Sequence, residues 1–498
     1  MNKELEKKDT EKNVSTERDD RLRKLEEIKK LGLDPYPAKV NRDFAILEFL
    51  TKFKDLESVK NSINLAGRIR AKRVHGNLAF VNLEDESASV QLVFSKKDLG
   101  DDSYKKFIKL IDVGDFLQIT GKAFLTHKEE KSVLISEFKI LGKALRPIPD
   151  SWFGLKDNED RFRHRYLDLL INPEIKDIFY KKAKFWEVTR NFLKRNGFFE
   201  VETPTLEVTT GGAEANPFKT HHKDFDIPVY LRISIGELWQ KRLMAAGYEK
   251  VFEIGRAYRN EGSSPDHLQE FTNMEFYWAY SNYEKGMDFV RELYQEIAKE
   301  VFGKTKFSTR GFEYDLAGEW PKIDYCETVL EKTGINVLTA SESEMKEKLN
   351  ELGVKYEGDN KERLTDTLWK YCRKTIAGPV FLINHPKLVS PLAKAKTDNP
   401  ELTERFQIII AGSEIGNGFS ELNDPIDQAA RFKIQQELID RGDEEAMMPD
   451  WEFVEMLEYA MPPTFGFGFG ERFFSFLCDK SIRETTLFPL MKPKFEDN

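Results

Sequence analysis

Cysteine is scarce in this sequence, which has three among its 498 residues. Cys326, Cys372 and Cys478 lie far apart, and none belongs to a Cys-x-x-Cys pair. This spacing suggests neither a disulfide framework nor a cysteine-based zinc site. We therefore expect a protein of the reducing cytoplasm.

Long apolar runs are also missing. No stretch approaches the roughly 18 consecutive apolar residues that a membrane-spanning helix needs, and the polar amino terminus lacks the apolar core of a secretory signal. Apolar residues make up 40% of the chain and charged residues 33%, as is typical of a soluble globular protein. The length exceeds what one hydrophobic core usually supports, so we expect two or three domains and no membrane partner.

An excess of positive charge is absent too. The formal net charge is −9, which argues against a protein that coats nucleic acid indiscriminately. The charge is uneven, however, because residues 64–146 contain 15 Lys and Arg against 11 Asp and Glu, a local excess of 4 positive charges. A basic segment in an acidic chain favours selective docking of an RNA, and we expect no DNA partner.

The first sixty residues divide into two parts. Residues 1–20 are almost wholly polar with mixed charge and are predicted to be a disordered tail. Residues 21–60 are predicted to be a helical segment. Its first helix has apolar residues at helical spacing, which are Leu22, Leu25, Ile28 and Leu31.

Between residues 61 and 146, short β-prone runs replace the helical pattern. Five such runs occur, and a helical stretch over 103–112 separates the third from the fourth. The runs are Leu65–Ile69, Ala79–Leu83, Val90–Phe94, Phe116–Thr120 and Val133–Lys139. Five strands with one interposed helix predict an OB-fold barrel, although the spacing alone also allows a small mixed sheet of another topology.

Residues 147–498 are predicted to form a second domain with mixed α and β structure. The stiff segment Arg146-Pro-Ile-Pro-Asp150 marks the boundary. Helical lead-in segments follow at 163–170 and 175–196, and the charged amphipathic stretch 341–377 is interpreted as a helical insertion. Strand-like runs lie at 228–234, 251–258, 271–280, 379–384, 406–411 and 417–423.

A charged loop between two β-prone segments carries the strongest functional signal. It contains Arg259, Glu261 and His267, and the flanking segments predict a hairpin. Two further segments are Gly197-Phe-Phe-Glu-Val-Glu-Thr-Pro204 and Gly466-Phe-Gly-Phe-Gly-Glu-Arg472. In chain order the three resemble motifs 1, 2 and 3 of the class II aminoacyl-tRNA synthetases. Each alone is a weak signal, and without the others Arg259 and Glu261 would be interpreted as a solvated surface pair.

The resemblance implies an α+β fold, with the OB-fold barrel followed by a catalytic antiparallel sheet flanked by helices. It also implies amino-acid activation by displacement at the α-phosphorus of ATP. Arginine suits this chemistry because its planar guanidinium binds phosphate through two hydrogen bonds and stays charged. Arg259 would clamp the α-phosphate and the substrate carboxylate, and Glu261 would hold the adenine amino group. His267 would face the outer phosphates, Phe271 would stack on adenine, and Arg472 would reach the γ-phosphate. The glycines before Arg472 would let that strand pass close to the nucleotide.

The segment from Ser413 to Asp424 indicates which amino acid is activated. It resembles the signature of the class II lysyl-tRNA synthetases, whereas the aspartyl enzymes carry an arginine where Glu421 stands. A buried carboxylate pairs with the ε-ammonium of lysine, while an arginine would pair with a substrate carboxylate. Within this resemblance, Glu237 would hold the α-amino group. The residues implied for lysine binding are Gly212, Glu237, Glu275, Tyr277, Asn417, Phe419 and Glu421.

One departure from the family concerns Mg²⁺. Glu414 matches the acidic residue that binds Mg²⁺ beside ATP, but its usual acidic companion, seven residues earlier, is Gln407 here. A neutral amide offers a hard cation less charge than a carboxylate does. We therefore expect one Mg²⁺ to bind weakly or through water.

The predicted barrel carries residues that match the anticodon contacts of this subgroup. Phe80 would stack on the central uridine, Gln91 would hydrogen-bond its Watson–Crick edge, and Arg68 would add a phosphate or base contact. From the residues alone, Phe80 could equally be an ordinary aromatic of the barrel core. The surrounding segment, Asn77 to Asp85, matches the family and favours the RNA contact.

The resemblance extends over residues 20–495 and predicts an enzyme that joins lysine to tRNA(Lys) with ATP and Mg²⁺. It also implies a homodimer, since motif 1 with Pro204 is the usual dimer element. Two alternatives stay open, an aspartyl or asparaginyl enzyme of the same subclass and a non-catalytic synthetase-like protein that binds RNA. Glu237 and Glu421 argue against the first. The retained residues Arg259, Glu261, Glu414 and Arg472 argue against the second.

Overall fold

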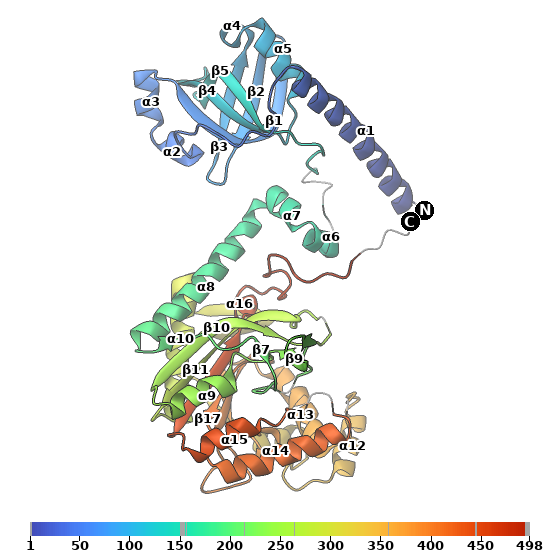
Figure 1. Cartoon of the computed structure of the whole chain (residues 1–498), viewed down its shortest axis with the longest axis vertical. Coiled ribbons are helices and arrows are strands. Elements are labelled where there is room, and N and C mark those ends of the chain that lie inside the picture. Colours follow the sequence, from blue (N-terminus) through green and yellow to red (C-terminus); the bar gives the residue numbers. More distant parts are fainter. Residues whose placement is uncertain are drawn as a thin grey trace. The chain divides into compact units, whose positions relative to one another are not determined.

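The chain folds into two compact units, residues 1–155 and residues 156–498, which are described one at a time. Figure 1 shows the computed structural model. It describes residues 2–149, 155, 157–213, 215–262, 264–356, 358–443 and 446–493, without the side chains of residues 2–15. The division falls later than the segment at 146–150 that was predicted to mark it.

The first unit begins with helix α1 (Asn2–Lys30). This helix runs through residues 2–20, for which the polar composition predicted a disordered tail. Lys and Glu residues have high helix propensity and tolerate neighbours of opposite charge, and the Arg21 guanidinium pairs with Glu17 at 2.8 Å. Leu25 and Ile28 of the predicted apolar face are buried, so the helix is anchored through its second half.

Residues 63–142 form a closed five-stranded barrel, as predicted for an OB-fold. The strands are β1 (Ile63–His75), β2 (Leu78–Glu84), β3 (Ser89–Ser95), β4 (Phe116–Leu125) and β5 (Lys131–Gly142). They follow the order β1-β2-β3-β5-β4, in which β3 pairs with β5 in parallel. The remaining helices of this unit are α2 (Ile46–Thr51), α3 (Phe53–Val59), α4 (Lys96–Leu99) and α5 (Asp101–Leu110). The last two lie between β3 and β4, where one helix was predicted.

An eight-stranded sheet forms the centre of the second unit, in the order β14-β15-β16-β17-β18-β11-β10-β6. Its strands are β6 (Phe199–Glu200), β10 (Lys250–Tyr258), β11 (Glu270–Ala279), β14 (Lys322–Asp324), β15 (Val380–Ile383), β16 (Arg405–Ile410), β17 (Ser413–Ser420) and β18 (Thr464–Gly470). The pairings from β15 to β10 are antiparallel, and the two outermost pairings are parallel. The predicted α+β class with a mainly antiparallel sheet is therefore confirmed.

The other described strands of this unit form two small sheets. The strand predicted at 228–234 is β9 (Ile227–Leu231), which pairs with β7 (Leu206–Glu207) and β8 (Lys219–His222) instead of joining the large sheet. A separate hairpin consists of β12 (Lys306–Thr309) and β13 (Phe312–Asp315).

Helices cover both faces of the large sheet, as Figure 1 shows. One face packs against α8 (Lys176–Arg195), α10 (Tyr283–Phe302) and α16 (Arg472–Leu477), and the other against α9 (Glu237–Ala245), α14 (Pro425–Asp440) and α15 (Trp451–Glu458). The lead-in helices are α6 (Asn158–Arg163), α7 (Arg165–Ile171) and α8. The stretch 341–377 contains α12 (Glu342–Glu351) and α13 (Lys361–Cys372), which pack with α11 (Tyr325–Thr333). Within the described part of the chain, no helix combines the length and apolar character needed to cross a membrane.

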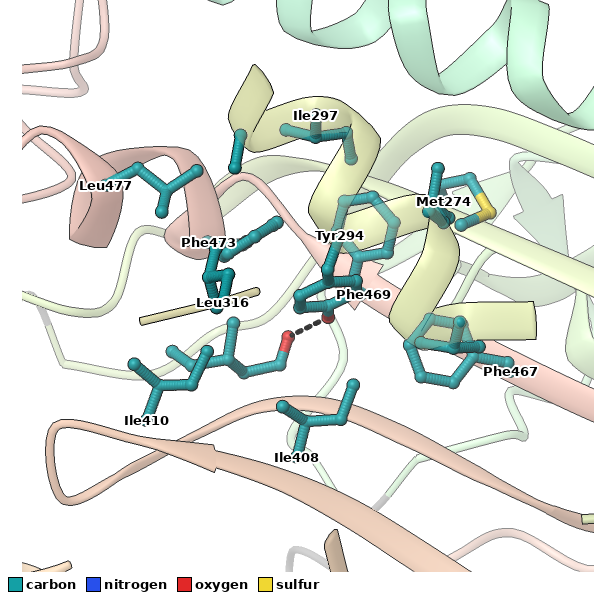
Figure 2. Close-up of a cluster of buried hydrophobic side chains, with 14 of the residues drawn as sticks. Met274, Tyr294, Ile297, Leu316, Ile408, Ile410, Phe467, Phe469, Phe473 and Leu477 are labelled. Carbon is teal, nitrogen blue, oxygen red and sulfur yellow. Dashed lines mark hydrogen bonds between the residues drawn. The ribbon is translucent and has the colours of Figure 1, made fainter. Parts of the chain in front are cut away.

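Alternation along β18 separates the core from the candidate site. Phe465, Phe467 and Phe469 belong to a large apolar cluster on one side of the sheet. Figure 2 shows part of this cluster, in which the Tyr294 hydroxyl donates a hydrogen bond to the Ile415 carbonyl at 3.0 Å. The glycines 466, 468 and 470 occupy the alternate positions and face the other side. Because these positions carry no side chains, they leave a hollow above the sheet.

Candidate active site and nucleic-acid surface

A cavity of about 500 Å³ lies on the glycine side of β18. Every residue predicted to bind ATP, the amino acid or a metal lines this cavity. These residues are Gly212, Glu237, Arg259, Glu261, His267, Phe271, Glu275, Tyr277, Glu414, Asn417, Phe419, Glu421 and Arg472. The fold therefore brings together segments that are widely separated in the sequence.

The β10–β11 hairpin places Arg259 at one end of the cavity. The Arg259 N–H donates to the Gln269 carbonyl at 2.9 Å, which closes the loop. The guanidinium lies 5.4 Å from the centre of the Phe271 ring, and its Nε donates to the Ile233 carbonyl at 3.3 Å. Burial lowers the pKa of Arg259, but nearby carboxylates oppose this shift; they belong to Glu261, Glu275 and Glu414. The result is an oriented, charged guanidinium that can bind an anion.

An ion pair fixes the loop that carries His267. The guanidinium of Arg310, at the turn of the β12–β13 hairpin, pairs with both carboxylate oxygens of Asp266, one of them at 2.9 Å. Burial, together with the charge of Arg472, lowers the pKa of His267. The imidazole is therefore neutral near pH 7 and would meet a phosphate as a hydrogen-bonding group rather than as a cation.

Arg472 is the first residue of α16 and reaches toward β17. Its guanidinium donates to the backbone carbonyl of Glu414. Burial lowers the pKa of Arg472, and the Glu414 carboxylate opposes the shift. With Arg259, this residue gives one end of the cavity two guanidinium groups, an arrangement suited to a polyphosphate.

Three buried carboxylates form the other end of the cavity. Glu237, Glu275 and Glu421 are 6%, 7% and 1% exposed. Glu275 accepts hydrogen bonds from the Ile235 N–H at 2.8 Å and the Tyr277 hydroxyl at 3.1 Å. Burial, reinforced by the charge of Glu237, raises the pKa of Glu275 to about 7. Carboxylates buried this closely favour a cationic ligand, because leaving them without a counter-charge is costly.

Two glycines leave room for these carboxylates. A Cβ added at Gly466 would lie 2.0 Å from Glu421 Oε1. A Cβ added at Gly212, whose φ is +87°, would lie 2.8 Å from Glu237 Oε2. A Cβ at Gly466 would also lie 2.7 Å from Tyr277 Cε1, and a Cβ at Gly212 would lie 2.6 Å from Glu237 Cβ, so a larger residue at either position would displace the pocket side chains. The resemblance assigns the glycines of β18 to the nucleotide, and Gly466 in addition lies against a carboxylate of the amino-acid pocket.

The cavity lining also includes an oxygen suited to a metal. The side chains of Glu414 and Gln407 both line it, and Gln407 is 7% exposed. Over the described ranges, no group of three or more His, Cys, Asp and Glu side chains could hold a metal by itself. One carboxylate and one amide oxygen fit a Mg²⁺ ion whose other ligands are phosphate oxygens and water.

Three residues next to the predicted ones were missed. Lys241 pairs with Glu237 and Glu421, Arg405 Nε donates to Asn417 Oδ1 at 2.9 Å, and Arg310 fixes the His267 loop. The spacing of Lys241, four residues after a glutamate in a helix, was a signal available in the sequence. The other two contacts depend on how distant strands pair, which no local pattern reveals.

The outer face of the barrel carries the residues predicted to contact the anticodon. Arg68 of β1, Phe80 of β2 and Gln91 of β3 alternate with the buried core positions of their strands. Phe80 is half-buried and outside the apolar cluster of the barrel, so it is not an ordinary core aromatic. The Arg68 guanidinium lies 4.2 Å from the centre of the Phe116 ring, and Gln91 donates to Ser132 Oγ at 2.9 Å. Three adjacent strands thus present aromatic, cationic and amide groups, the combination by which proteins bind single-stranded RNA.

Comparison with known protein families matches both units. Residues 157–492 match the family described as tRNA synthetases class II (D, K and N), and residues 63–141 match an OB-fold nucleic acid binding domain. The chain belongs to the class II tRNA synthetases, which confirms the predicted family and the predicted barrel.

Several relatives named lysine–tRNA ligase resemble this chain over almost its whole length. The protein of Thermotoga maritima is 41% identical across 96% of this chain and 97% of its own. That of Carboxydothermus hydrogenoformans is 43% identical across 95% and 97%, and that of Roseiflexus castenholzii is 42% identical across 95% and 98%. The similarity therefore extends through both units.

Proposed function

We propose that this chain is an ATP-dependent lysine–tRNA ligase, which activates lysine as an adenylate and transfers it to the 3′ end of tRNA(Lys). Relatives with this name match nearly its whole length. The observation that carries the proposal is Glu421, which is almost fully buried and whose Oε1 accepts no hydrogen bond from the described residues. Lys241 pairs with the other oxygen of Glu421, and a buried carboxylate oxygen that still lacks a hydrogen bond favours a cationic donor such as the ε-ammonium of lysine.

The other pocket residues complete the lysine site. Glu237, in the first turn of α9, would bind the α-amino group, and Glu275 and Tyr277 would line the side-chain pocket beside Glu421. The remaining lining residues are Gly212, Asn417 and Phe419. The side chain of aspartate would meet carboxylates here, and that repulsion argues against an aspartyl enzyme.

The proposed reaction needs no side-chain nucleophile, because the lysine carboxylate attacks the α-phosphorus and pyrophosphate leaves. Arg259 would bind the α-phosphate and the carboxylate, where charge changes most in the transition state. Arg472 and the neutral His267 would hold the outer phosphates. Glu261 would accept a hydrogen bond from the adenine amino group, and Phe271 would stack on the adenine. The 3′-terminal ribose hydroxyl of the tRNA then attacks the acyl carbon and releases AMP.

Glu414, with the amide oxygen of Gln407, would hold Mg²⁺ beside the triphosphate. When bound, the ion neutralises phosphate charge. Gln407→Glu is expected to lower the Mg²⁺ concentration for half-maximal exchange by about tenfold, because a carboxylate binds a hard cation more strongly. A Mg²⁺ titration of lysine-dependent ATP–pyrophosphate exchange measures this, with the rate at saturating Mg²⁺ as the control. An unchanged titration would show that position 407 does not contribute to the ion.

The outer face of the barrel is proposed to read the anticodon. Phe80→Ala should lower kcat/KM for aminoacylation of tRNA(Lys) by about 5- to 100-fold, because one base loses its stacking partner. Lysine-dependent exchange does not require tRNA, so it should be unchanged in the same preparation. Aminoacylation at the wild-type rate would reject the anticodon assignment of Phe80.

A cytoplasmic homodimer is also proposed. Apolar side chains are more than half exposed around the motif 1 segment, among them Phe199, Leu206 and Val208. The ring of Tyr248 stacks on Phe199 with centres 6.0 Å apart, beside the edge strand β6. A second copy would cover this patch. Light scattering should give twice the 58.0 kDa mass of one chain.

All three cysteines are free thiols, which fits a reducing compartment.

Amino-acid-dependent ATP–pyrophosphate exchange tests the proposed activity directly. Exchange is expected with lysine and not with aspartate or asparagine. Exchange with either of those instead would reject the lysine pocket and leave the family intact. No exchange with any of the three at saturating Mg²⁺ would favour a non-catalytic role in RNA binding.

A further inference from the structure

Lys241 lies beside the carboxylates of the proposed lysine pocket, and the reaction described above does not use it. It belongs to α9, one turn after Glu237, and is 1% exposed. Its Nζ lies 2.7 Å from Glu237 Oε1 and 2.5 Å from Glu421 Oε2. One ammonium group therefore joins helix α9 to the residue that follows β17.

Aromatic rings surround the rest of this ammonium group. The ring centres of Tyr277, Phe419 and Phe453 lie 5.9, 5.4 and 5.8 Å from Lys241 Nζ. Such rings stabilise a cation without forming an ion pair with it. The ion pairs of Lys241 with Glu237 and Glu421 thus fix the position of a permanent charge in the wall of the pocket.

Lys241 keeps its charge in these surroundings. Burial opposes ionisation, but Glu237 and Glu421 outweigh it and raise the pKa of the ammonium. Burial raises the pKa of Glu421 as well, and Lys241 opposes that shift. Without Lys241, two buried carboxylates would share one region with no counter-ion, and proton uptake would follow.

The net charge of the pocket depends on this residue. Three carboxyl groups and one ammonium group lie at this end of the cavity, so the carboxyl groups outnumber the ammonium group by two, and lysine has two ammonium groups. Lys241 pairs with one oxygen of Glu237 and one oxygen of Glu421. The second oxygen of Glu421, Oε1, accepts no hydrogen bond from the described part of the chain, so it is available to a substrate.

We propose that Lys241 is a positioning residue that makes the pocket specific for an amino acid with two ammonium groups. It orients both Glu237 and Glu421, opposes protonation of Glu421, and pairs with only one oxygen of each, so that the other oxygen can face the substrate. This inference rests on the proposed function, because it assigns a role within the same pocket. Lys241 does not touch the reacting atoms, so its effect falls on lysine binding and not on the chemical step.

Lys241→Met tests the role, because it removes the charge with little change in volume. In exchange assays near pH 7, the KM for lysine should rise about 10- to 100-fold. The KM for ATP and kcat should change less than about threefold. The inhibition constant of norleucine, which lacks the ε-ammonium, should change less than about threefold as well, so that selectivity for lysine falls.

The pH dependence separates this role from a purely structural one. Between about pH 6.5 and about pH 8.5, the ratio of the variant KM for lysine to the wild-type KM should fall, because the protonated carboxylates ionise again. A packing defect would give the same ratio at both pH values. The comparison with wild type removes the effect of substrate ionisation.

Lys143→Met is the matched control. Lys143, which directly follows β5 in the first unit, is also buried, and it pairs with Asp112 at 2.6 Å and Asp115 at 2.8 Å. Its loss carries the same kind of structural cost, so it should lower Tm and leave the KM for lysine unchanged. Lys241→Gln is a second pocket variant, whose amide still donates hydrogen bonds but carries no charge. It should show the same rise in the KM for lysine.

An unchanged KM for lysine in a folded Lys241 variant overturns the inference. A rise in KM that is the same at both pH values and affects ATP as much as lysine also overturns the inference. Failure of both Lys241 variants to fold, when Lys143→Met folds, overturns it as well. Absence of lysine-dependent exchange in the wild-type enzyme would instead reject the proposed function, which keeps the two failures distinguishable.

Discussion

Arg259→Lys is expected to lower kcat for lysine-dependent ATP–pyrophosphate exchange by about 10²- to 10³-fold. The Arg259 guanidinium is oriented by the Ile233 carbonyl and by the Phe271 ring. A planar group held in this way can bridge the α-phosphate and the lysine carboxylate through separate hydrogen bonds. A lysine ammonium is a point charge on a flexible stem and would satisfy one of the two anions. Exchange kinetics with lysine and ATP varied independently would show the loss mainly in kcat.

Arg256→Lys on the same hairpin is the matched control. The Arg256 side chain is exposed and lies 3.6 Å from Glu270, with about half of each side chain open to solvent. Exposed pairs of this kind contribute little, typically less than about 1 kcal/mol, so exchange should stay within about twofold of wild type. Equal losses in both variants would indicate damage to the hairpin, and an unchanged kcat in Arg259→Lys would contradict the assigned role.

The barrel strands could be predicted because each has one buried and one outward face. Ala79, Val81 and Leu83 alternate with outward residues along β2, and a period of two is visible in a single segment. The same signal placed a strand near 228–234, but it could not show that β9 pairs with β7 and β8. Pairing partners are set by tertiary contacts that the segment itself does not contain.

The polar first twenty residues show a case in which composition predicted too little structure. Low hydrophobicity predicted a tail, but alternating Lys and Glu residues also have high helix propensity. Helix α1 continues through them because its second half is anchored on the barrel by buried residues such as Leu25 and Ile28. Composition indicates how little apolar surface a segment can bury. It does not show whether a helix formed by the neighbouring residues continues into that segment.

Candidate site residues could be predicted only where a motif marked them. Arg259, Glu421 and Arg472 lie in such motifs, and the fold places all three on one cavity. Lys241 escaped prediction because a lysine on a helix is normally solvated. The proposed role of Lys241 depends on its ion pair with Glu421, a residue that is close in space but 180 positions away in the sequence.

Glu421→Gln is expected to lower kcat/KM for lysine in ATP–pyrophosphate exchange by about 10²- to 10³-fold, mostly through KM. The amide has the size of the carboxylate but no charge, so it can neither pair with the ε-ammonium nor balance Lys241 at 2.5 Å. Gly466, against which Glu421 Oε1 lies, allows the amide the same space. Steric exclusion of lysine therefore cannot explain the loss. Glu455→Gln on the exposed side of α15 is the matched control and should retain wild-type kinetics.

The pH dependence of the KM for lysine distinguishes the role of the Glu421 carboxylate from that of Lys241, which positions it. An amide cannot ionise, so the Glu421→Gln loss should be the same at about pH 6.5 and about pH 8.5. The Lys241→Met loss should shrink over that interval, because its carboxylates are still present and release protons. Lysine exchange with a wild-type KM in Glu421→Gln would contradict the pocket assignment. A loss that recovers at high pH in both variants would place the titrating group elsewhere, with Glu275 as the next candidate because its pKa is raised to about 7.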